Sequence, residues 1–507
     1  MSGDERGTVR IRLNGAWVEA DEGQKLSELL RVHSHAEMPC NGRGVCRKCR
    51  VRVTGAVSAP EEAEKTALGE ALREGVRLAC MTRVEGECHV TTLDADTLRV
   101  MTDGDALHVG DPLFDHYGMA LDIGTTTLAA KLFDRRGGCI GEAGMRNPQS
   151  VFGADVISRI EASLGGEREA LARRICQGID QLTERLAETG GISPGEIDGC
   201  VITGNTAMLY FLTSTPPDDL SKAPFRAHRL FGEVLTARAL GLNALSSETT
   251  IYLPPCISAF VGADSVTALL AAEADGIMEG RLLADIGTNG ELLFRSREGL
   301  LCCSTAAGPA FEGAGISCGM MGKQGAVDHV YLVNGRPEVT VIGGGTPLGI
   351  CGSGLLDAVA CLLNVEELDE TGFLEDEPAH IASGVALTQE DIRAVQLAKG
   401  AVCAGIRTLL ENGNTEAEQV TQLAIAGGFG SYLDPASAAR VGLFPKELQG
   451  KVKPLGNAAL TGACMLLLDR ECRERAEGYA RDAVTLELSS NPVFSNHFIN
   501  EMLFPTE

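Results

Sequence analysis

One tetrapeptide, Asp-Ile-Gly-Thr, occurs twice in this chain of 507 residues, at residues 122–125 and again at residues 285–288. Each copy follows an apolar run typical of a buried strand, and a second apolar run comes directly after it. A strand, a tight turn and a second strand, repeated 163 residues apart, indicate two similar lobes that face each other. A chain of this length also exceeds what a single hydrophobic core can organise, so we expect several domains.

The two repeats have the composition of phosphate-binding loops. Glycine lets consecutive backbone N–H groups curl around an oxyanion, threonine hydroxyls add donors, and an aspartate at a strand end can hold Mg²⁺ through water. A single copy would also fit an ordinary β-turn, whereas two copies in matching strand contexts favour phosphate. The candidate residues are Asp122, Gly124, Thr125, Thr126 and Thr127 in the first loop and Asp285, Gly287, Thr288 and Asn289 in the second.

A third glycine-rich turn follows the apolar run at residues 422–426 and contains Gly427, Gly428 and Gly430. It lacks the G-x-G-x-x-G pattern of a dinucleotide-binding turn, and the chain contains no G-x-x-x-x-G-K-[ST] loop. Glycines here would let the backbone approach an adenine ring and its ribose. The order of two phosphate loops and then this adenosine turn resembles the sugar kinase/Hsp70/actin superfamily.

That resemblance implies two α/β lobes, each built around a five-stranded mixed sheet, with ATP and Mg²⁺ in the cleft between them. It also singles out Asp264, which lies 21 residues before Asp285, much as the catalytic base does in related sugar kinases. The alternative for Asp264 is the N-cap of an alanine-rich helix over residues 265–274. Glu291, just past the second loop, is the competing carboxylate that would position the hydrolytic water.

Four cysteines near the N-terminus have the spacing of an iron–sulfur site. Cys40, Cys46 and Cys49 form a C-x₅-C-x₂-C loop that contains glycine, and Cys80 follows 31 positions later. Such a loop lets several sulfurs converge on two irons, so we expect a [2Fe–2S] cluster and electron transfer. A structural zinc site is the rival, but zinc sites usually show paired C-x₂-C units and only one short pair exists here.

The sequence around these cysteines resembles a β-grasp ferredoxin over residues 1–95. An Asn14-Gly15 turn is typical of a hairpin, and the ligand spacing is closer to the adrenodoxin-like pattern than to the plant-type pattern. We predict strands at residues 8–13, 16–20, 50–54 and 88–92, a helix at 25–34, and a segment at 77–84 that delivers Cys80.

Charge and cysteine content exclude several classes of partner. The net charge is −25, yet residues 1–95 contain 14 basic and 15 acidic residues, so the remainder carries −24. This acidity argues against nucleic acid and against an anionic membrane surface. Seventeen cysteines in a long chain without a secretory signal or a membrane-length apolar run predict a cytoplasmic protein. Five cations between residues 40 and 52 either raise the potential of the cluster or form a docking collar for an acidic redox partner.

The combination of a ferredoxin with a pair of ATP-binding lobes resembles the reductive activators of corrinoid proteins. Residues 306–320, 349–355 and 491–505 carry this resemblance further. It implies that ATP and the cluster are used to reduce the inactive Co(II) corrinoid protein of a methyltransferase system to Co(I). A low-potential electron donor would reload the cluster, and a homodimer is compatible with this function. The best-known members insert a separate middle domain before the ATP lobes, and the short linker here leaves no room for one.

We therefore predict an α/β and α+β multidomain chain: a β-grasp ferredoxin domain followed by a two-lobed ATPase of the actin/Hsp70/sugar-kinase type. The rivals are an activator of another low-potential enzyme such as a 2-hydroxyacyl-CoA dehydratase, a small-molecule kinase with an accessory redox domain, and a redox-sensing actin-like module without turnover. Cys302, Cys303, Cys318 and Cys351 are interpreted as small buried residues. The predicted boundaries are a ferredoxin domain at 1–95, a linker at 96–116 with one short strand at 98–101, a first lobe at 117–278, and a second lobe at 279–507 whose C-terminal Phe494, Phe498 and Phe504 return to the first lobe.

Overall fold

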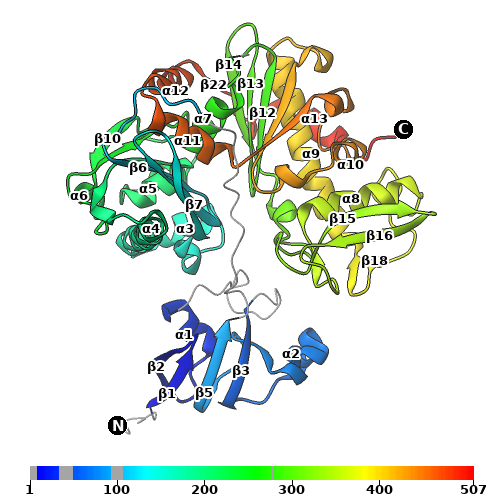
Figure 1. Ribbon diagram of the computed structural model, residues 1–507. Helices are drawn as coiled ribbons and strands as arrows, with labels where there is room; N and C mark the ends of the chain where they lie inside the picture. Colours follow the sequence, from blue (N-terminus) through cyan, green and yellow to red (C-terminus); the bar gives the residue numbers. More distant parts are fainter. Residues whose placement is uncertain (1–7, 34–48, 93–106, 277, 507) are drawn as a thin grey trace.

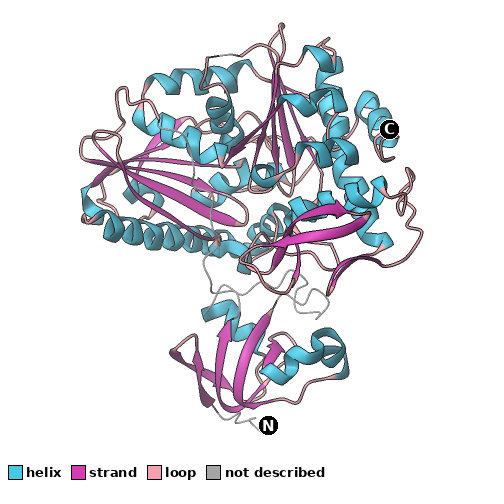
Figure 2. Cartoon of the chain, turned by 45° about the vertical axis from the view of Figure 1, so that its right-hand side comes forward, coloured by secondary structure: helices cyan, strands magenta, loops and turns pink. Residues whose placement is uncertain are grey.

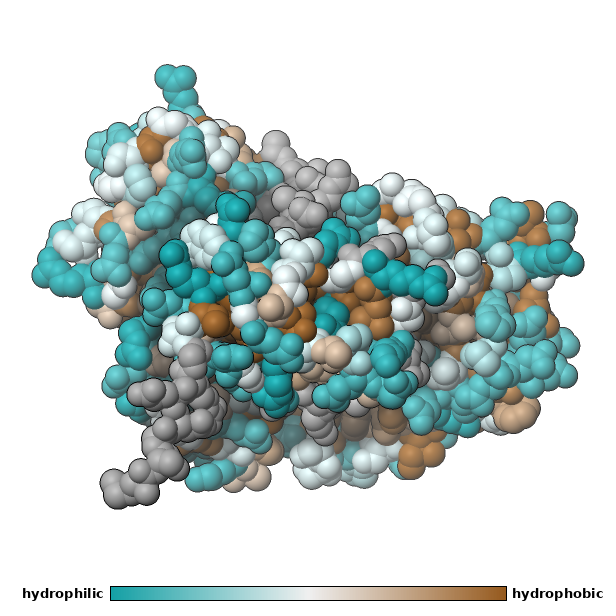
Figure 3. Space-filling model, turned by 90° about the horizontal axis from the view of Figure 1, so that it is seen from below, coloured by the Kyte–Doolittle hydropathy of each residue, from teal (hydrophilic) through white to brown (hydrophobic). Residues whose placement is uncertain are grey.

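The computed structural model describes residues 8–33, 49–92, 107–276 and 278–506. These residues form a small N-terminal domain and a larger body with two lobes (Figure 1). The face of the molecule seen in Figure 3 is largely hydrophilic with small apolar groups between, in keeping with the high content of acidic residues. Within the described ranges, no helix is both long and apolar enough to cross a membrane.

The N-terminal domain is a five-stranded sheet in the order β2-β1-β5-β3-β4, as a β-grasp ferredoxin requires. Asn14 and Gly15 have φ angles of 48° and 90°, the positive values with which a two-residue hairpin matches the twist of its strands. The predicted elements are confirmed, and α2 (Glu62–Leu68) is an addition. The other bounds are β1 Thr8–Leu13, β2 Ala16–Asp21, α1 Leu26–His33, β3 Arg50–Val57, β4 Val76–Leu78 and β5 Val84–Thr92.

The two lobes of the body repeat one sheet topology, which confirms the duplication expected from the sequence. In each lobe a central strand begins an antiparallel meander of three strands on one side and pairs with two successive parallel strands on the other. The orders are β8-β7-β6-β9-β11 and β14-β13-β12-β20-β21, and each sheet gains a sixth strand at one edge, β10 or β22. Figure 2 shows both sheets with helices packed against them.

The first lobe contains β6 (Tyr117–Ile123), β7 (Thr127–Asp134), β8 (Cys139–Arg146), β9 (Ile197–Gly204), β10 (Glu233–Thr236) and β11 (Thr250–Leu253), with α3 (Val156–Ala162), α4 (Arg168–Gly190), α5 (Thr206–Leu212), α6 (Ala237–Leu240) and α7 (Ala263–Ala272). The second contains β12 (Arg281–Ile286), β13 (Gly290–Arg295), β14 (Leu300–Thr305), β20 (Gln422–Ala426), β21 (Val452–Gly456) and β22 (Val484–Thr485), with α8 (Gly352–Asn364), α9 (Gln389–Asn412) and α10 (Pro435–Val441). It also carries the small sheets β16 (Arg336–Val341)-β15 (Ala326–Val333)-β17 (Gly349–Ile350) and β18 (Ala379–Ala382)-β19 (Val385–Leu387).

Two helices, α7 and α11 (Ala458–Leu468), pack against each other between the lobes. The hydrophobic cluster around them takes Val201 from the first-lobe sheet and Leu283 from the second-lobe sheet. The helices approach so closely that a Cβ on Gly462 would lie 1.8 Å from the carbonyl oxygen of Thr267. This crossing is therefore the point where the two lobes are joined by direct helix packing.

Part of the predicted linker belongs to the body. Phe114 is 5% exposed, and the N–H of Leu113 donates to the carbonyl of Leu467 in α11 at 2.8 Å. Residues 107–116 are therefore packed against the two-lobed body, because the Phe114 side chain is buried there and Leu113 N–H is hydrogen-bonded. The strand predicted at residues 98–101 lies outside the described residues.

The prediction that the C-terminal phenylalanines return to the first lobe is wrong. Helix α13 (Pro492–Asn500) packs on α9 of the second lobe, and Phe504 is 2% exposed. Three side chains of α9 hold this end of the chain: Gln396 and Lys399 donate to backbone carbonyls after α13, and Arg407 pairs with Glu501 at 2.6 Å. The part of the C-terminal region that does contact the first lobe is α11, which packs on β6 and β9.

Candidate functional site

The predicted first phosphate loop is the turn between β6 and β7, where the antiparallel register pairs Asp122 with Ala129. Side chains from three distant positions hold its backbone. Asn147 Nδ2 donates to the Gly124 carbonyl at 2.8 Å, Arg159 Nη2 donates to the Thr125 carbonyl at 2.7 Å, and Asn205 Nδ2 donates to Thr125 Oγ1 at 3.3 Å. The loop is thus fixed by its own lobe, with Thr126 half-buried and Thr127 opening β7.

The second phosphate loop lies directly beside the predicted adenosine turn. Strands β12 and β20 are parallel and pair Asp285 with Ala426, so both turns leave the same end of the sheet. Gly427 has a φ of +91°, and a Cβ there would lie 3.0 Å from Asp285 Oδ1. A Cβ on Gly428 would meet nothing within 4 Å, so this turn has an open side. Gly287 N–H donates to the Asn289 carbonyl, and Gly430 packs against Ile425 where a Cβ would clash.

The carboxylates of the two lobes lie close enough to influence one another's charge. Asn457, the residue before α11, accepts from Leu460 N–H and donates to Asp122 Oδ2 at 3.1 Å. Burial raises the pKa of Asp122 to about 7, against the lowering effect of Asn457, and the charge of Asp285 adds to the rise. Asp122 has therefore been brought near the second-lobe loop, although it belongs to the first lobe.

The other carboxyls respond to the same surroundings. Burial, followed by the charge of Asp122, raises the pKa of Asp264 to about 7. Burial, followed by the charges of Asp264 and Glu312, raises the pKa of Asp285 to about 7. Burial, followed by the charges of Asp264 and Asp285, raises the pKa of Glu291 well above its ordinary value. Mutual repulsion of this kind is what a bound cation relieves.

This donor set fits Mg²⁺ held through water. Hard carboxylate oxygens and phosphate oxygens are the ligands that Mg²⁺ uses, and it keeps several of its waters. In the part of the chain that is described, no three His, Cys, Asp or Glu side chains converge closely enough to bind a metal ion directly. The ion would therefore contact Asp122 and Asp285 mainly through water and the phosphates of the nucleotide.

Asp264 is not an N-cap. Helix α7 begins at Ala263 with Gly262 as its N-cap, two residues before the predicted start, and Asp264 lies in the first turn. Its carboxylate accepts from Ser265 N–H at 2.8 Å and lies where the positive end of the helix favours negative charge. Glu291 lies in β13 and accepts from Ser304 Oγ at 3.3 Å.

Sequence reasoning missed five residues that contact the two loops or Asp122. Four of them are Asn147, Arg159, Asn205 and Asn457, which hold the first phosphate loop and Asp122, and the fifth is Glu312, whose Oε2 accepts from Thr288 Oγ1 at 3.0 Å. They come from positions scattered along the chain. No spacing in the sequence relates them to the loops that they contact.

Two of the four predicted cluster ligands lie in the described residues, and they converge. Cys49 and Cys80 are 2% and 1% exposed, and their sulfurs are 3.3 Å apart. A disulfide bond would be about 2.05 Å long, so the two sulfurs are not bonded to each other, and the Cys49 thiol is placed to donate to Cys80 Sγ. Cys40 and Cys46 lie outside the described residues.

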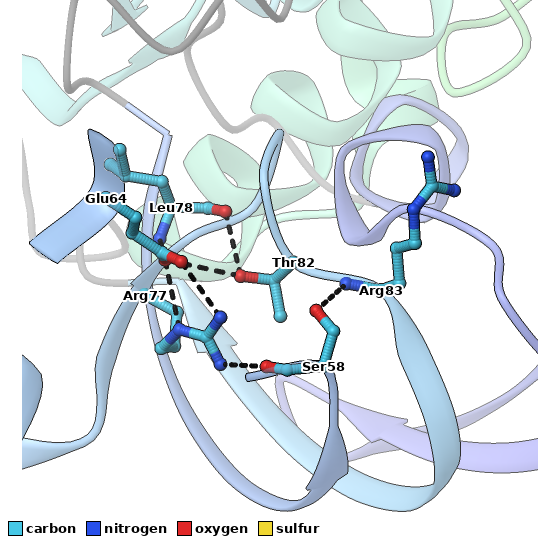
Figure 4. Close-up of polar contacts among 6 residues, drawn as sticks. All are labelled: Ser58, Glu64, Arg77, Leu78, Thr82 and Arg83. Atoms are coloured by element: carbon cyan, nitrogen blue, oxygen red, sulfur yellow. Dashed lines mark hydrogen bonds and ion pairs between the residues drawn. The ribbon is translucent and has the colours of Figure 1, made fainter. Parts of the chain in front are cut away.

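A buried polar network holds the segment that carries Cys80 (Figure 4). Glu64 is completely buried and accepts two hydrogen bonds from Arg77, at 3.0 and 2.9 Å, and one from Leu78 N–H at 2.7 Å. Arg77 also donates to the Ser58 carbonyl, and Thr82 Oγ1 donates to the Leu78 carbonyl. The network therefore fixes the backbone on both sides of Cys80.

Glu64→Ala should destabilise the ferredoxin domain by about 3–5 kcal/mol, because removal of one partner leaves the Arg77 charge buried and unpaired. The measurement is thermal loss of the visible cluster absorption. Glu62→Ala is the matched control: its side chain is 87% exposed and pairs with Lys65, so its loss should cost less than about 1 kcal/mol. Equal effects of the two substitutions would contradict this assignment.

The cysteines of the second lobe have the properties of core residues. Cys302, Cys303 and Cys351 are buried and Cys318 is half-buried. Burial raises the pKa of the Cys302 and Cys318 thiols to about 11 and that of Cys303 well above its ordinary value. Thiols with raised pKa stay protonated near neutral pH, whereas metal-binding and nucleophilic cysteines are thiolates.

Comparison with known proteins adds matches to three family models. They are described as "2Fe-2S iron-sulfur cluster binding domain" at residues 11–85, "RACo middle region" at 117–276 and "C-terminal domain of RACo the ASKHA domain" at 279–507. The match at 117–276 contradicts the expectation that this chain has no room for a middle domain. That region is the first lobe itself.

Individual relatives match over most of their length. The corrinoid activation enzyme RamQ of Eubacterium limosum is 32% identical over 420 residues, which are 76% of this chain and 70% of the relative. The "[Co(II) methylated amine-specific corrinoid protein] reductase" of Methanosarcina barkeri is 24% identical over 423 residues, 77% of each chain. A solved "Reductive activator for corrinoid,iron-sulfur protein" superposes with a TM-score of 0.69 at 25% identity and covers 98% of both chains.

Proposed function

Because this chain belongs to the family of reductive activators of corrinoid proteins, we propose that it uses ATP to return the inactive Co(II) corrinoid protein of a methyltransferase or demethylase system to Co(I). The observation that carries the proposal is the union, in one chain, of converging ferredoxin cysteines and a two-lobed cleft with a phosphate loop in each lobe. An electron carrier alone would not need the cleft, and an ATPase alone would not need the cysteines.

The cysteines and their support make the electron source. Cys49 and Cys80, with Cys40 and Cys46, would hold a [2Fe–2S] cluster, which supplies one electron at a time. The reduction potential of such a cluster is about −400 mV in plant-type ferredoxins. Cobalt in its Co(I) state is itself strongly reducing, so transfer at such a potential is unfavourable or marginal. The corrinoid protein must therefore be bound in an arrangement that makes its reduction easier.

ATP can provide that arrangement by binding one conformation better than another. Asp122 and the first loop belong to one lobe, and Asp285 and the adenosine turn belong to the other. A nucleotide that contacts both loops favours the conformation in which the two lobes are closed, because only that conformation lets the second lobe contact the nucleotide. Hydrolysis and phosphate release would then remove this preference and return the chain to its starting state.

The roles of individual residues follow from their places in the cleft. Asp122 and Asp285 would hold Mg²⁺ through water, the threonines of both loops would donate to phosphates, and Gly427, Gly428 and Gly430 would frame the adenosine. Glu291 would position the hydrolytic water, with Asp264 as its partner carboxylate. Burial raises the pKa of Asp264 to about 7, so this carboxyl can exchange a proton near neutral pH, and burial also raises the pKa of Glu291.

The small-molecule kinase differs from this proposal in its product, because it would release a phosphorylated metabolite and no Co(I) corrinoid protein.

The remaining proposals concern the electron donor, the cellular compartment and the oligomeric state. A low-potential electron donor reloads the ferredoxin domain, and the exposed cations Arg50 and Arg52 beside Cys49 favour an acidic donor surface. The chain acts in the cytoplasm, where its thiols stay reduced, and a homodimer is compatible with the function.

The test is anaerobic reduction of the corrinoid protein. Reduced chain, Mg-ATP and Co(II) corrinoid protein should give the Co(I) absorption spectrum, while samples with ADP or without nucleotide should give little. ATP hydrolysis should accelerate when the Co(II) protein is added. Equal Co(I) formation with and without ATP would disprove the proposal, and a phosphorylated small molecule in place of Co(I) would establish the kinase.

A further inference from the structure

Residues 309–320 connect the second phosphate loop to distant parts of the second lobe. The segment begins with a 3₁₀ turn, Pro309–Glu312. Thr288 Oγ1 in the loop donates to Glu312 Oε2 at 3.0 Å, and a Cβ on Gly287 would lie 3.4 Å from Oε1. Both carboxylate oxygens of Glu312 are therefore at the loop where phosphate would bind.

The turn that carries Glu312 is packed between two other elements. Phe311 stacks on Phe429 of the adenosine turn, with ring centres 4.9 Å apart and planes 12° from parallel. A Cβ on Gly352 would lie 2.0 Å from the Phe311 carbonyl oxygen, so the start of α8 lies directly on this turn. In a close-packed interior the turn cannot shift without displacing these neighbours.

The end of the segment is bonded to two further elements. Met320 N–H donates to the Ile350 carbonyl and Ile350 N–H donates to the Cys318 carbonyl, at 2.8 and 2.9 Å. The N–H and hydroxyl of Ser317 donate to Asp391 at 2.7 and 2.5 Å. A change at Glu312 therefore reaches β17 and α8 through a continuous set of contacts.

We propose that Glu312 senses the γ-phosphate of ATP and transmits its presence to residues 309–320 and the start of α8. The inference rests on the proposed ATPase function. A hydroxyl has one proton, so Thr288 donates either to Glu312 or to a phosphate oxygen. Carboxylate and phosphate are both anionic and repel each other in the same space. ATP therefore releases Glu312 from Thr288, and the turn moves together with Phe311.

This mechanism has a thermodynamic consequence that separates it from magnesium binding. Moving the turn uses part of the free energy of ATP binding, because coupling between two events is reciprocal. A chain that lacks the Glu312 charge should bind ATP more tightly and fail to move the turn. A residue that held Mg²⁺ would have the opposite effect, since its loss weakens Mg-ATP binding.

Glu312→Gln tests the proposal, because glutamine keeps the shape and the acceptor for Thr288 while removing the charge. We expect ATP affinity, measured by calorimetry on the full chain, to rise about tenfold, in the range of one charged hydrogen bond. Affinity for ADP should not change. The difference between ATP and ADP in amide hydrogen exchange of residues 309–320 and 349–355 should disappear. Glu338→Gln, an exposed change in β16, should leave both measurements as in the parent.

Weaker ATP binding by the Glu312→Gln chain, or a preserved exchange difference, would overturn the proposal. The parent chain gives a test that needs no variant: ATP, and not ADP, must increase exchange in residues 309–320. Neither measurement uses a corrinoid protein. Failure here is therefore distinct from failure of the proposed function, which is read from the Co(I) spectrum.

Discussion

Asp285→Asn should abolish ATP-dependent formation of Co(I), with a loss of at least about 100-fold, while the visible spectrum of the cluster stays unchanged. Asp285 lies at the end of β12, beside Gly427 of the proposed adenosine turn, and it is the second-lobe carboxylate that we propose to hold Mg²⁺ through water. Asparagine keeps the shape and removes the charge that holds the hydrated ion. The measurement is the rate of Co(I) formation in anaerobic stopped flow, beside the rate of ATP hydrolysis.

The same substitution should stabilise the chain in the absence of nucleotide and magnesium. The pKa of Asp285 is about 7 in the folded state, against an ordinary value of 3.8, so the folded state holds an extra proton between these pH values. Stability therefore falls as pH rises from about 4 to about 7, and the penalty is complete above 7. Because the carboxylate keeps some contact with solvent, we expect Asp285→Asn to raise the free energy of unfolding by about 1–2 kcal/mol at pH 8.

Below about pH 3 the difference in stability between Asp285→Asn and the parent should vanish, because the parent carboxyl is then protonated in both the folded and the unfolded state. Asp376→Asn, an exposed change in the same lobe, should alter neither activity nor stability. Retained ATP-dependent reduction in the Asp285→Asn chain would remove this carboxylate from the mechanism.

Gly462→Ala should destabilise the ATPase body by about 3 kcal/mol, although alanine is the better helix former by about 1 kcal/mol. A Cβ at this position would lie 1.8 Å from the Thr267 carbonyl oxygen, so α11 and α7 must separate. Both helices are packed against the central sheets, and their separation should also uncouple the lobes. Differential scanning calorimetry should show a lower unfolding temperature for the variant. Added ATP should raise this temperature by less than it raises that of the parent.

The matched control is Gly478→Ala in α12 (Glu471–Asp482). There an added Cβ would meet only the end of the Arg481 side chain, at 3.5 Å. The change in stability then depends on helix propensity alone, so the Gly478→Ala variant should be more stable than the parent by up to about 1 kcal/mol. If the two substitutions changed stability in the same direction, the helix crossing would not be the constraint that we describe.

Local patterns predicted the elements whose signals are short-range. The Asn14-Gly15 hairpin, the alternating strands of the ferredoxin domain and the two Asp-Ile-Gly-Thr turns depend on residues that are neighbours in the chain. Ligand spacing grouped Cys49 and Cys80 with two further cysteines, and the sulfurs of these two lie 3.3 Å apart. The roles of Cys40 and Cys46 stay a prediction.

Patterns failed where contacts are long-range. Phe494 and Phe498 gave no indication of the lobe they would contact, because the choice depends on the side chains that α9 presents. The first lobe was not identified as the middle region of the family, since its phosphate loop alone suggested an ordinary ATPase lobe. Glu312 lies in the stretch 306–320 that carries the family resemblance, but its contact with the second loop became visible only through its bond to Thr288.

The sequence by itself determined the chemistry of this protein, because cysteine spacing and duplicated glycine–threonine turns place donor groups within a few residues of one another. The tertiary structure decided how that chemistry is connected. Asn457 reaches Asp122 across 335 positions, and Gly462 meets Thr267 at the junction of the lobes. Such contacts depend on how two sheets and their helices pack in three dimensions, which no local pattern specifies.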